Sequence, residues 1–230
     1  MTPNYTTVLF DADATLLDFD RAEERSLKKT FQDHNLTLTD TMQNRYRELN
    51  NGLWAAFEQG KIPKEQIMDT RFALLFEEFH IAEDGVLFDR EYLSNVANSY
   101  DVFPDAETIC KRLYPYCRLY FATNGDVKTQ MHRIAGSGLQ KYFLDTFVSE
   151  AAGEPKPSPV FFRYCFDHIP DLDKEKTIMI GDSLYSDIKG AQDAGIHTCW
   201  FNPEHREPVI PLKPDFEVDS LLSLEKIILG

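Results

Sequence analysis

The amino-acid sequence predicts an α/β fold, in which an open parallel sheet of the Rossmann-like kind carries an inserted all-helical domain. Three short apolar runs that end in polar residues predict the sheet, because strands buried on both faces are continuously apolar. Helix-like segments alternate with these runs, as is typical of open α/β sheets. Residues 20–100 contain amphipathic helical patterns and no convincing strand, which predicts the insert.

The first predicted strand is the run TTVLF, which ends directly before Asp11. The insert comes next, and apolar stripes at helical spacing from Tyr46 to Phe57 and from Met68 to Phe79 indicate its helices. Side chains in such stripes usually belong to a helical core. We therefore expect several packed helices between the first strand and the rest of the sheet.

The later elements return the chain to the sheet. The run RLYFA ends before Thr123, the run TIMI ends before Gly181 and Asp182, and residues 197–201 predict a further strand. Helical segments are expected around residues 126–136, 159–168 and 184–194. The resulting division is an α/β core domain of residues 1–19 and 101–230 and a helical domain of residues 20–100.

The composition excludes several classes of protein. A net charge of −14 disfavours binding to a nucleic acid polymer, which depends on clustered Lys and Arg. No apolar run approaches the roughly 20 residues that span a bilayer, and the N-terminus carries no export-type signal. The four cysteines form no CxxC pair, which argues against a zinc or redox motif. We expect a cytoplasmic protein without a membrane partner, either a monomer or a small homo-oligomer.

The polar strand ends predict one shared site. In an open α/β sheet the ligand crevice lies outside the carboxyl ends of the strands, so the residues that follow those ends should gather there. Three or more carboxylates in one crevice require a hard cation, and ligands that are all oxygen atoms favour Mg²⁺. The residues expected at this edge are Asp11, Asp13 and Thr15, then Thr123 and Asn124, then Asp182 and Asp187.

A site of this kind suits phosphoryl transfer. One carboxylate can attack phosphorus to give an aspartyl-phosphate, and a second can act as general acid and then as general base. Hydroxyl and N–H groups at Thr123 and Asn124, together with a lysine, would balance charge on the phosphoryl group. Lys156 is the candidate lysine, because it lies between two prolines that stiffen its approach to the site.

Four short motifs occur in a fixed order along the chain. They are DADAT at residues 11–15, ATNG around Thr123, EPKPSP around Lys156, and GDSLYSD at residues 181–187. As an ordered set they resemble the motifs of the haloacid dehalogenase-like superfamily of hydrolases. The resemblance covers residues 1–19 and 101–220 as the core, and it implies that the helical insert is the cap domain of the family.

The resemblance also implies roles for individual residues. Asp11 is expected to be the nucleophile and a metal ligand, and Asp13 the acid/base, with its backbone carbonyl on the metal. Asp182 is expected to be the third protein ligand to Mg²⁺, and Asp187 to hold the metal directly or through its neighbours. The residues expected to bind phosphate are Thr15, Thr123, Asn124 and Lys156.

A narrower resemblance extends through FDADATLLDFDRAE, GLWAAFEQGKI and GDSLYSDIKGAQDAG. These stretches are similar to the YjjG/YfnB-type group, whose characterised members are pyrimidine 5'-nucleotidases. This implies a small phosphorylated substrate, a nucleoside 5'-monophosphate. Ala14 departs from the pattern, since the family usually has Gly at this position and the group often has Asp.

Other functions stay open on the same core. They are a sugar-phosphate phosphatase or phosphosugar mutase, a haloacid dehalogenase, and a non-catalytic phosphate-binding protein. Asp13 favours a phosphatase over a dehalogenase, because the dehalogenases of the family lack this second acid and displacement at carbon needs no general acid. Phe19 and Trp54 are the candidate substrate contacts, although aromatic side chains at helical spacing are more often core residues.

Overall fold

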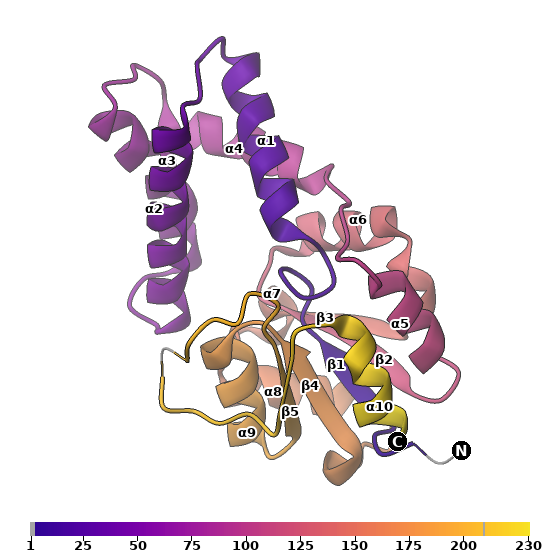
Figure 1. Ribbon diagram of the computed structural model, residues 1–230. Helices are drawn as coiled ribbons and strands as arrows, with labels where there is room; N and C mark the ends of the chain where they lie inside the picture. Colours follow the sequence, from indigo (N-terminus) through magenta and orange to yellow (C-terminus); the bar gives the residue numbers. More distant parts are fainter. Residues whose placement is uncertain (1–2, 209) are drawn as a thin grey trace. The chain divides into compact units, whose positions relative to one another are not determined.

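The computed structural model of the protein describes residues 3–208 and 210–230 (Figure 1). The chain divides into two compact units. The first consists of the chain up to Phe19 together with Tyr100–Gly230, and the second is Asp20–Ser99. The first contains the sheet and the second is helical.

Within the described residues, six strands form one parallel sheet in the order β3-β2-β1-β4-β5-β6. The strands are β1 (Thr7–Phe10), β2 (Arg118–Thr123), β3 (Asp145–Val148), β4 (Thr177–Gly181), β5 (His197–Phe201) and β6 (Phe216–Val218). The predicted Rossmann-like sheet is confirmed, including the strand at residues 197–201. Strand order reverses between β1 and β4, and in such sheets this point marks the ligand crevice.

Helices cover both faces of the sheet (Figure 1). Successive residues of each strand point to opposite faces, so one strand contacts helices on both sides. In β1, Val8 and Phe10 pack with residues of α5 (Ala106–Leu113), α6 (Val127–Ser137) and α10 (Leu224–Leu229). Leu9 packs on the other face with α8 (Pro159–His168) and α9 (Gly190–Ala194). The helix predicted around residues 184–194 is a π-helical turn, Leu184–Lys189, that continues into α9. A short α7 (Ser149–Ala152) follows β3.

The second unit contains α2 (Asp40–Glu58), α3 (Lys64–Glu78), α4 (Gly85–Ala97) and all of α1 (Phe19–Asp33) except its first residue. Its interior includes the buried rings of Phe31, Phe72, Phe76, Phe88 and Tyr92. The predicted stripe on α3 is therefore a core stripe. It also contains a residue that the apolar pattern missed, since the buried Arg71 donates to the buried Asp89 at an N–O distance of 2.5 Å.

The four cysteines are free and buried. Burial raises the pKa of the Cys117 thiol to about 11 and that of Cys199 to about 12, and it raises the pKa of Cys110 and Cys165 as well. Because the thiolate is the reactive form, we expect the folded protein to react with Ellman's reagent about 100-fold or more slowly than a free thiol. All four thiols should react rapidly in denaturant. Rapid reaction of the folded protein would contradict the burial of these side chains.

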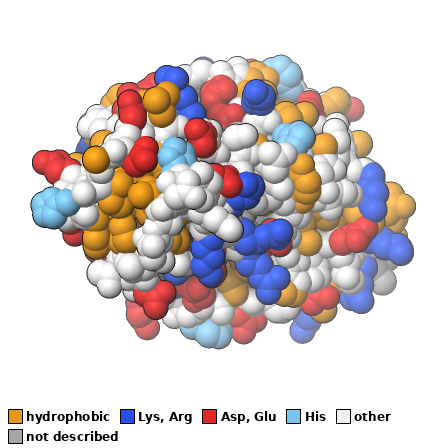
Figure 2. All heavy atoms as spheres, turned by 90° about the horizontal axis from the view of Figure 1, so that it is seen from above, with side chains coloured by type: hydrophobic (Ala, Val, Ile, Leu, Met, Phe, Trp, Pro, Cys, Tyr) orange, Lys and Arg blue, Asp and Glu red, His pale blue; other side chains and the backbone are white. Residues whose placement is uncertain are grey.

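No helix in the described part of the chain combines the length and apolar character needed to cross a bilayer. Acidic and basic side chains are interspersed over the face drawn in Figure 2. With a net charge of −14, this distribution gives no support to binding of a nucleic acid polymer.

Candidate active site

The parallel register brings the polar strand ends to one edge of the sheet. Phe10 of β1 pairs with Ile180 of β4, and the next residue, Asp11, continues the ladder by donating its backbone N–H to the Ile180 carbonyl at 2.8 Å. Thr123 is the last residue of β2, which borders β1 on its other side. Three motifs that are far apart in sequence therefore meet at the carboxyl edge.

The loop after Asp11 is a tight turn. The carbonyl of Ala12 accepts from the backbone N–H groups of Leu16 and Leu17 at 3.1 and 2.8 Å, and Ala14 donates to the Leu17 carbonyl at 2.9 Å. This turn places the fully buried Thr15 hydroxyl 3.5 Å from Oδ2 of Asp11. Thr15 thus lies against the predicted nucleophile.

Ala14 occupies a conformation that favours glycine, with φ of +57°. The left-handed region costs an L-residue about 1–2 kcal/mol, whereas glycine adopts it without this steric cost. Glycine loses more conformational entropy on folding, which offsets part of the difference in stability. We expect Ala14→Gly to stabilise the protein by about 1 kcal/mol, measured by denaturant unfolding. The matched control is Ala55→Gly on an exposed position of α2, which should destabilise by about 1 kcal/mol. Loss of stability in Ala14→Gly would contradict the strained turn.

Three carboxylates converge at this edge. Asp11, Asp182 and Asp187 each offer an oxygen, and these oxygens lie within 4.8 Å of one another. Asp11 and Asp187 are buried, and Asp182 is partly exposed. Such a set of hard oxygen donors fits a divalent cation of the Mg²⁺ type. The side chain of Asp13, by contrast, points to a different set of partners.

Lys156 is a buried positive charge within this cluster. The Lys156 side chain is 1% exposed, and its ammonium donates at 2.6 Å to each of three oxygens, on Asp11, Asp187 and the Ala122 carbonyl. Burial disfavours the charged form of Lys156, but the carboxylates of Asp11 and Asp187 outweigh it, so the pKa of Lys156 lies above its ordinary value. All three ammonium protons therefore have acceptors inside the protein.

Among the described residues, two cations contact the three carboxylates of the cluster, the buried Lys156 and the exposed Arg206, which pairs with Asp182 at 3.4 Å, and negative charge is still in excess. Burial raises the pKa of the Asp11 carboxyl well above its usual value; Lys156 opposes this shift, and the carboxylates of Asp187 and Asp182 add to it. Full ionisation of Asp11 therefore needs further positive charge. A bound cation supplies that charge most directly.

Asp187 is held in place by its surroundings. One carboxylate oxygen accepts from Lys156, and the other accepts from the backbone N–H of Ser183 at 3.1 Å. Gly181 is needed beside it, because a Cβ at that position would collide with the Asp187 side chain. Both oxygens of Asp187 are already used by the protein, which makes it a support for the cluster as much as a ligand.

The side chain of Asn124 forms hydrogen bonds with the backbone of Lys156. Its carboxamide oxygen accepts from the backbone N–H of Lys156 at 2.8 Å, and its Nδ2 donates to the Lys156 carbonyl at 3.0 Å. The sequence predicted Asn124 as a phosphate-binding residue. The prediction concerned the backbone N–H of Asn124, and it stays a prediction; the side chain contacts the backbone of Lys156.

The hydroxyl oxygen of Thr123 accepts two hydrogen bonds, which fix its orientation. Its Oγ1 accepts from Nε2 of Gln130 at 2.8 Å and from the backbone N–H of Gly125 at 3.1 Å. With both acceptor positions used, the hydroxyl proton is the part of Thr123 that can donate to an anion.

Asp13 has partners that sequence reasoning missed. One carboxylate oxygen accepts from Nε2 of Gln130 at 2.8 Å, and the other accepts from Nη1 of Arg133. Both partners lie on α6 and are 1% exposed. The available sequence signal was a pair of polar residues at i and i+3, which begins five residues after the end of the ATNG motif.

The two predicted substrate contacts lie in different surroundings. Phe19 has its ring 5.6 Å from the guanidinium carbon of Arg133, so it lies beside the partners of Asp13. Trp54 is on α2 of the helical unit, where its half-buried ring meets the edge of Phe57 at 5.7 Å between ring centroids. Contact of either ring with substrate stays a prediction.

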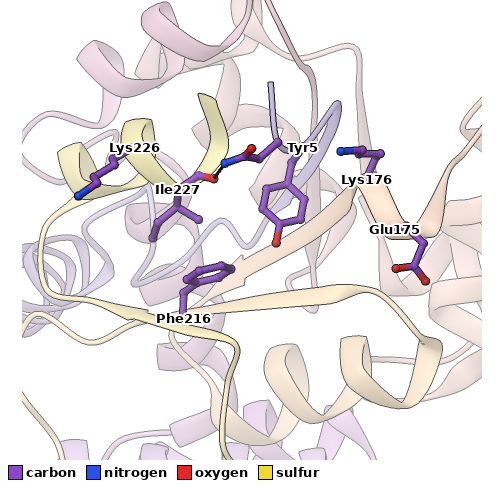
Figure 3. A pocket seen from close by; sticks show the side chains of 7 residues that line it. Tyr5, Glu175, Lys176, Phe216, Lys226 and Ile227 are labelled. Atoms are coloured by element: carbon purple, nitrogen blue, oxygen red, sulfur yellow. Dashed lines mark hydrogen bonds between the residues drawn. The ribbon is translucent and has the colours of Figure 1, made fainter. Parts of the chain in front are cut away.

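A separate hollow of about 560 Å³ lies at the opposite edge of the sheet (Figure 3). Tyr5 lies two residues before β1 and Lys176 one residue before β4, which places the hollow at the amino ends of the strands. Its lining includes the Phe216 ring and one carboxylate, from Glu175. It lacks the cluster of acids found at the carboxyl edge, so it offers no comparable chemistry.

Comparison with known proteins identifies relatives over nearly the whole chain. The family model for haloacid dehalogenase-like hydrolases matches residues 5–195. The HAD-hydrolase YfnB of Bacillus subtilis is 40% identical over 97% of this chain and 95% of its own length. A crystal structure of YfnB bound to magnesium, which reveals interdomain movement, matches with a TM-score of 0.94 and covers 97% of this chain and 98% of that one.

Two further relatives have named activities. The pyrimidine 5'-nucleotidase PynA of Streptococcus pneumoniae is 37% identical over 96% of this chain and 93% of its own. The pyrimidine 5'-nucleotidase YjjG of Escherichia coli is 31% identical over 96% of each chain. The similarity to this group, inferred from short motifs, is confirmed.

Proposed function

Because the chain belongs to the haloacid dehalogenase-like hydrolases, we propose that it is a Mg²⁺-dependent phosphomonoester hydrolase that uses an aspartyl-phosphate intermediate. Its proposed substrates are nucleoside 5'-monophosphates. The observation that carries the proposal is the cluster of Asp11, Asp182 and Asp187, whose oxygens lie within 4.8 Å of one another. The carboxylates of Asp11 and Asp187 also accept from the ammonium of Lys156.

The proposed metal site uses residues of this cluster. Asp11 and Asp182 would ligate Mg²⁺ through their carboxylates and Asp13 through its backbone carbonyl, while Asp187 supports the site directly or through its neighbours. When bound, Mg²⁺ supplies charge neutralisation at the phosphoryl oxygens. The hard oxygen donors and the excess of negative charge both support this assignment.

In the first proposed step, a carboxylate oxygen of Asp11 attacks phosphorus as the bond to the ester oxygen breaks. Asp13 donates a proton to that oxygen, so the alcohol leaves neutral. The hydroxyl of Thr123 donates to a phosphoryl oxygen, since its acceptor positions are taken by Gln130 and Gly125. Lys156 holds Asp11 in place through its 2.6 Å hydrogen bond and offsets negative charge.

In the second proposed step, water attacks phosphorus of the aspartyl-phosphate. Asp13, now ionised, accepts the proton of this water as the bond to Asp11 breaks. The step releases inorganic phosphate and regenerates the carboxylate of Asp11 and the protonated carboxyl of Asp13. Asp13 therefore separates this reaction from dehalogenation, where displacement of halide needs no such acid.

The helical unit Asp20–Ser99 is proposed to be the cap that covers the substrate. Closing a cap excludes bulk water during phosphoryl transfer. The interdomain movement of YfnB supports this proposal. Trp54 and Phe19 are the proposed aromatic contacts to the nucleoside.

A substrate panel tests the proposed function. With Mg²⁺ present, we expect release of phosphate from nucleoside 5'-monophosphates, with kcat/KM about 10-fold or more above that for hexose phosphates. The names of PynA and YjjG support this order of preference. Activity should disappear on chelation and return with Mg²⁺. Preference for sugar phosphates would favour the alternative on the same core, and metal-independent halide release from a 2-haloacid would overturn the phosphatase.

A further inference from the structure

The carboxylate of Asp13 is held at both oxygens by one turn of α6. Nε2 of Gln130 donates to Oδ2 at 2.8 Å, and Nη1 of Arg133 donates to Oδ1. The Asp13 side chain is 30% exposed, whereas that of Arg133 is 1% exposed. A carboxylate that solvent can reach has room to rotate, so these two buried donors decide which way it faces.

The two donors are themselves rigidly mounted. Asp126 caps the start of α6 by accepting from the backbone N–H of Thr129 at 2.9 Å. Gly125 leaves space for the Gln130 side chain, which a Cβ at that position would displace. The guanidinium of Arg133 lies over the Phe19 ring, at 5.6 Å from its centroid. Helix capping and close packing therefore fix the donors before any substrate arrives.

Gln130 also joins Asp13 to the predicted phosphate-binding hydroxyl. Its single Nε2 donates to both Oδ2 of Asp13 and Oγ1 of Thr123, each at 2.8 Å. The side chain that orients Asp13 thus also sets its separation from Thr123. If Thr123 holds the phosphoryl group, Gln130 defines how far the acid/base lies from the ester oxygen.

We propose that Gln130 and Arg133 are positioning residues for Asp13, which fix its carboxylate for proton transfer to the leaving group and from water. The proposal rests on the proposed function. Proton transfer requires a donor–acceptor separation of about 2.6–3.2 Å, so an error of about 1 Å in the carboxylate position is costly. A purely structural ion pair, in which Asp13 only neutralises the buried Arg133, makes a different experimental prediction.

The test compares two substrates whose leaving groups differ. Uridine 5'-monophosphate releases an alkoxide that needs a proton, whereas p-nitrophenyl phosphate releases a stable phenolate that does not. For Gln130→Met and Arg133→Met we expect kcat/KM to fall about 10–100-fold with the first substrate and less than about 3-fold with the second. Lys128→Met, on an exposed position of the same helix, should change neither.

A double-mutant cycle shows whether the two residues act through Asp13. In an Asp13→Asn background, Gln130→Met and Arg133→Met should each cause almost no further loss, because their target is already removed. Gln130→Met keeps the buried charge of Arg133, and Arg133→Lys keeps a cation, so the comparison does not depend on how well Arg133→Met folds. Arg133→Lys should recover part of the activity on uridine 5'-monophosphate.

The outcomes separate the two proposals. An equal loss with both substrates, repeated in the Asp13→Asn background, would overturn the positioning role while leaving an active phosphatase. Absence of hydrolysis of both substrates by the wild-type chain with Mg²⁺ would overturn the proposed function, and the positioning role with it.

Discussion

Asp11→Asn is expected to lower kcat on uridine 5'-monophosphate by about 10⁴-fold or more, the scale seen when a covalent nucleophile is removed. The substitution keeps the size of the side chain and removes its nucleophilic carboxylate oxygen. Lys156 donates at 2.6 Å to Oδ1 of Asp11, and Thr15 lies 3.5 Å from Oδ2, so the site depends on both oxygens at this position. The measurement is steady-state kcat together with acid-quench trapping of the phosphorylated enzyme.

The control for this experiment is Asp13→Asn. It retains the nucleophile, so brief mixing with p-nitrophenyl phosphate should still label the protein, and the label should be hydrolysed slowly because the general base is missing. Asp11→Asn should not become labelled. Equal labelling of both variants would show that Asp11 is not the residue that becomes phosphorylated.

Lys156→Met is expected to destabilise the protein by about 3–5 kcal/mol, because it leaves the charges of Asp11 and Asp187 buried without their partner. The lysine is 1% exposed, and methionine replaces most of its volume but none of its three hydrogen bonds. The measurement is denaturant unfolding with and without Mg²⁺. Mg²⁺ should recover part of the lost stability, since a cation bound only to the folded state offsets the same repulsion.

The matched control is Lys141→Met. Lys141 also forms a lysine–carboxylate pair, with Glu107 at 2.8 Å, but both side chains are more than half exposed. Its removal should change the unfolding midpoint little, because solvent screens the pair. A similarly small change in Lys156→Met would contradict the central place of Lys156 in the acidic cluster.

The sequence was sufficient to locate the edge of the sheet where the chemistry is proposed. Apolar runs that end at Asp11, Thr123 and Asp182 predict parallel strands, and the carboxyl ends of parallel strands share one edge whatever packs around them. The position of Lys156 between two prolines was also visible. The strand ends could be predicted because they depend on the local hydrophobic pattern and on the topology of the sheet.

The tertiary structure decided how individual side chains are used at that edge. It paired Asp13 with Arg133, turned Asn124 onto the backbone of Lys156, and placed Ala14 at φ of +57°. It also buried Arg71 against Asp89 inside the helical unit, in a stripe whose period looked purely apolar. Each of these outcomes depends on contacts between segments that are distant in sequence, or on the conformation of a turn. The hydrophobic period of the sequence contains no information about such contacts.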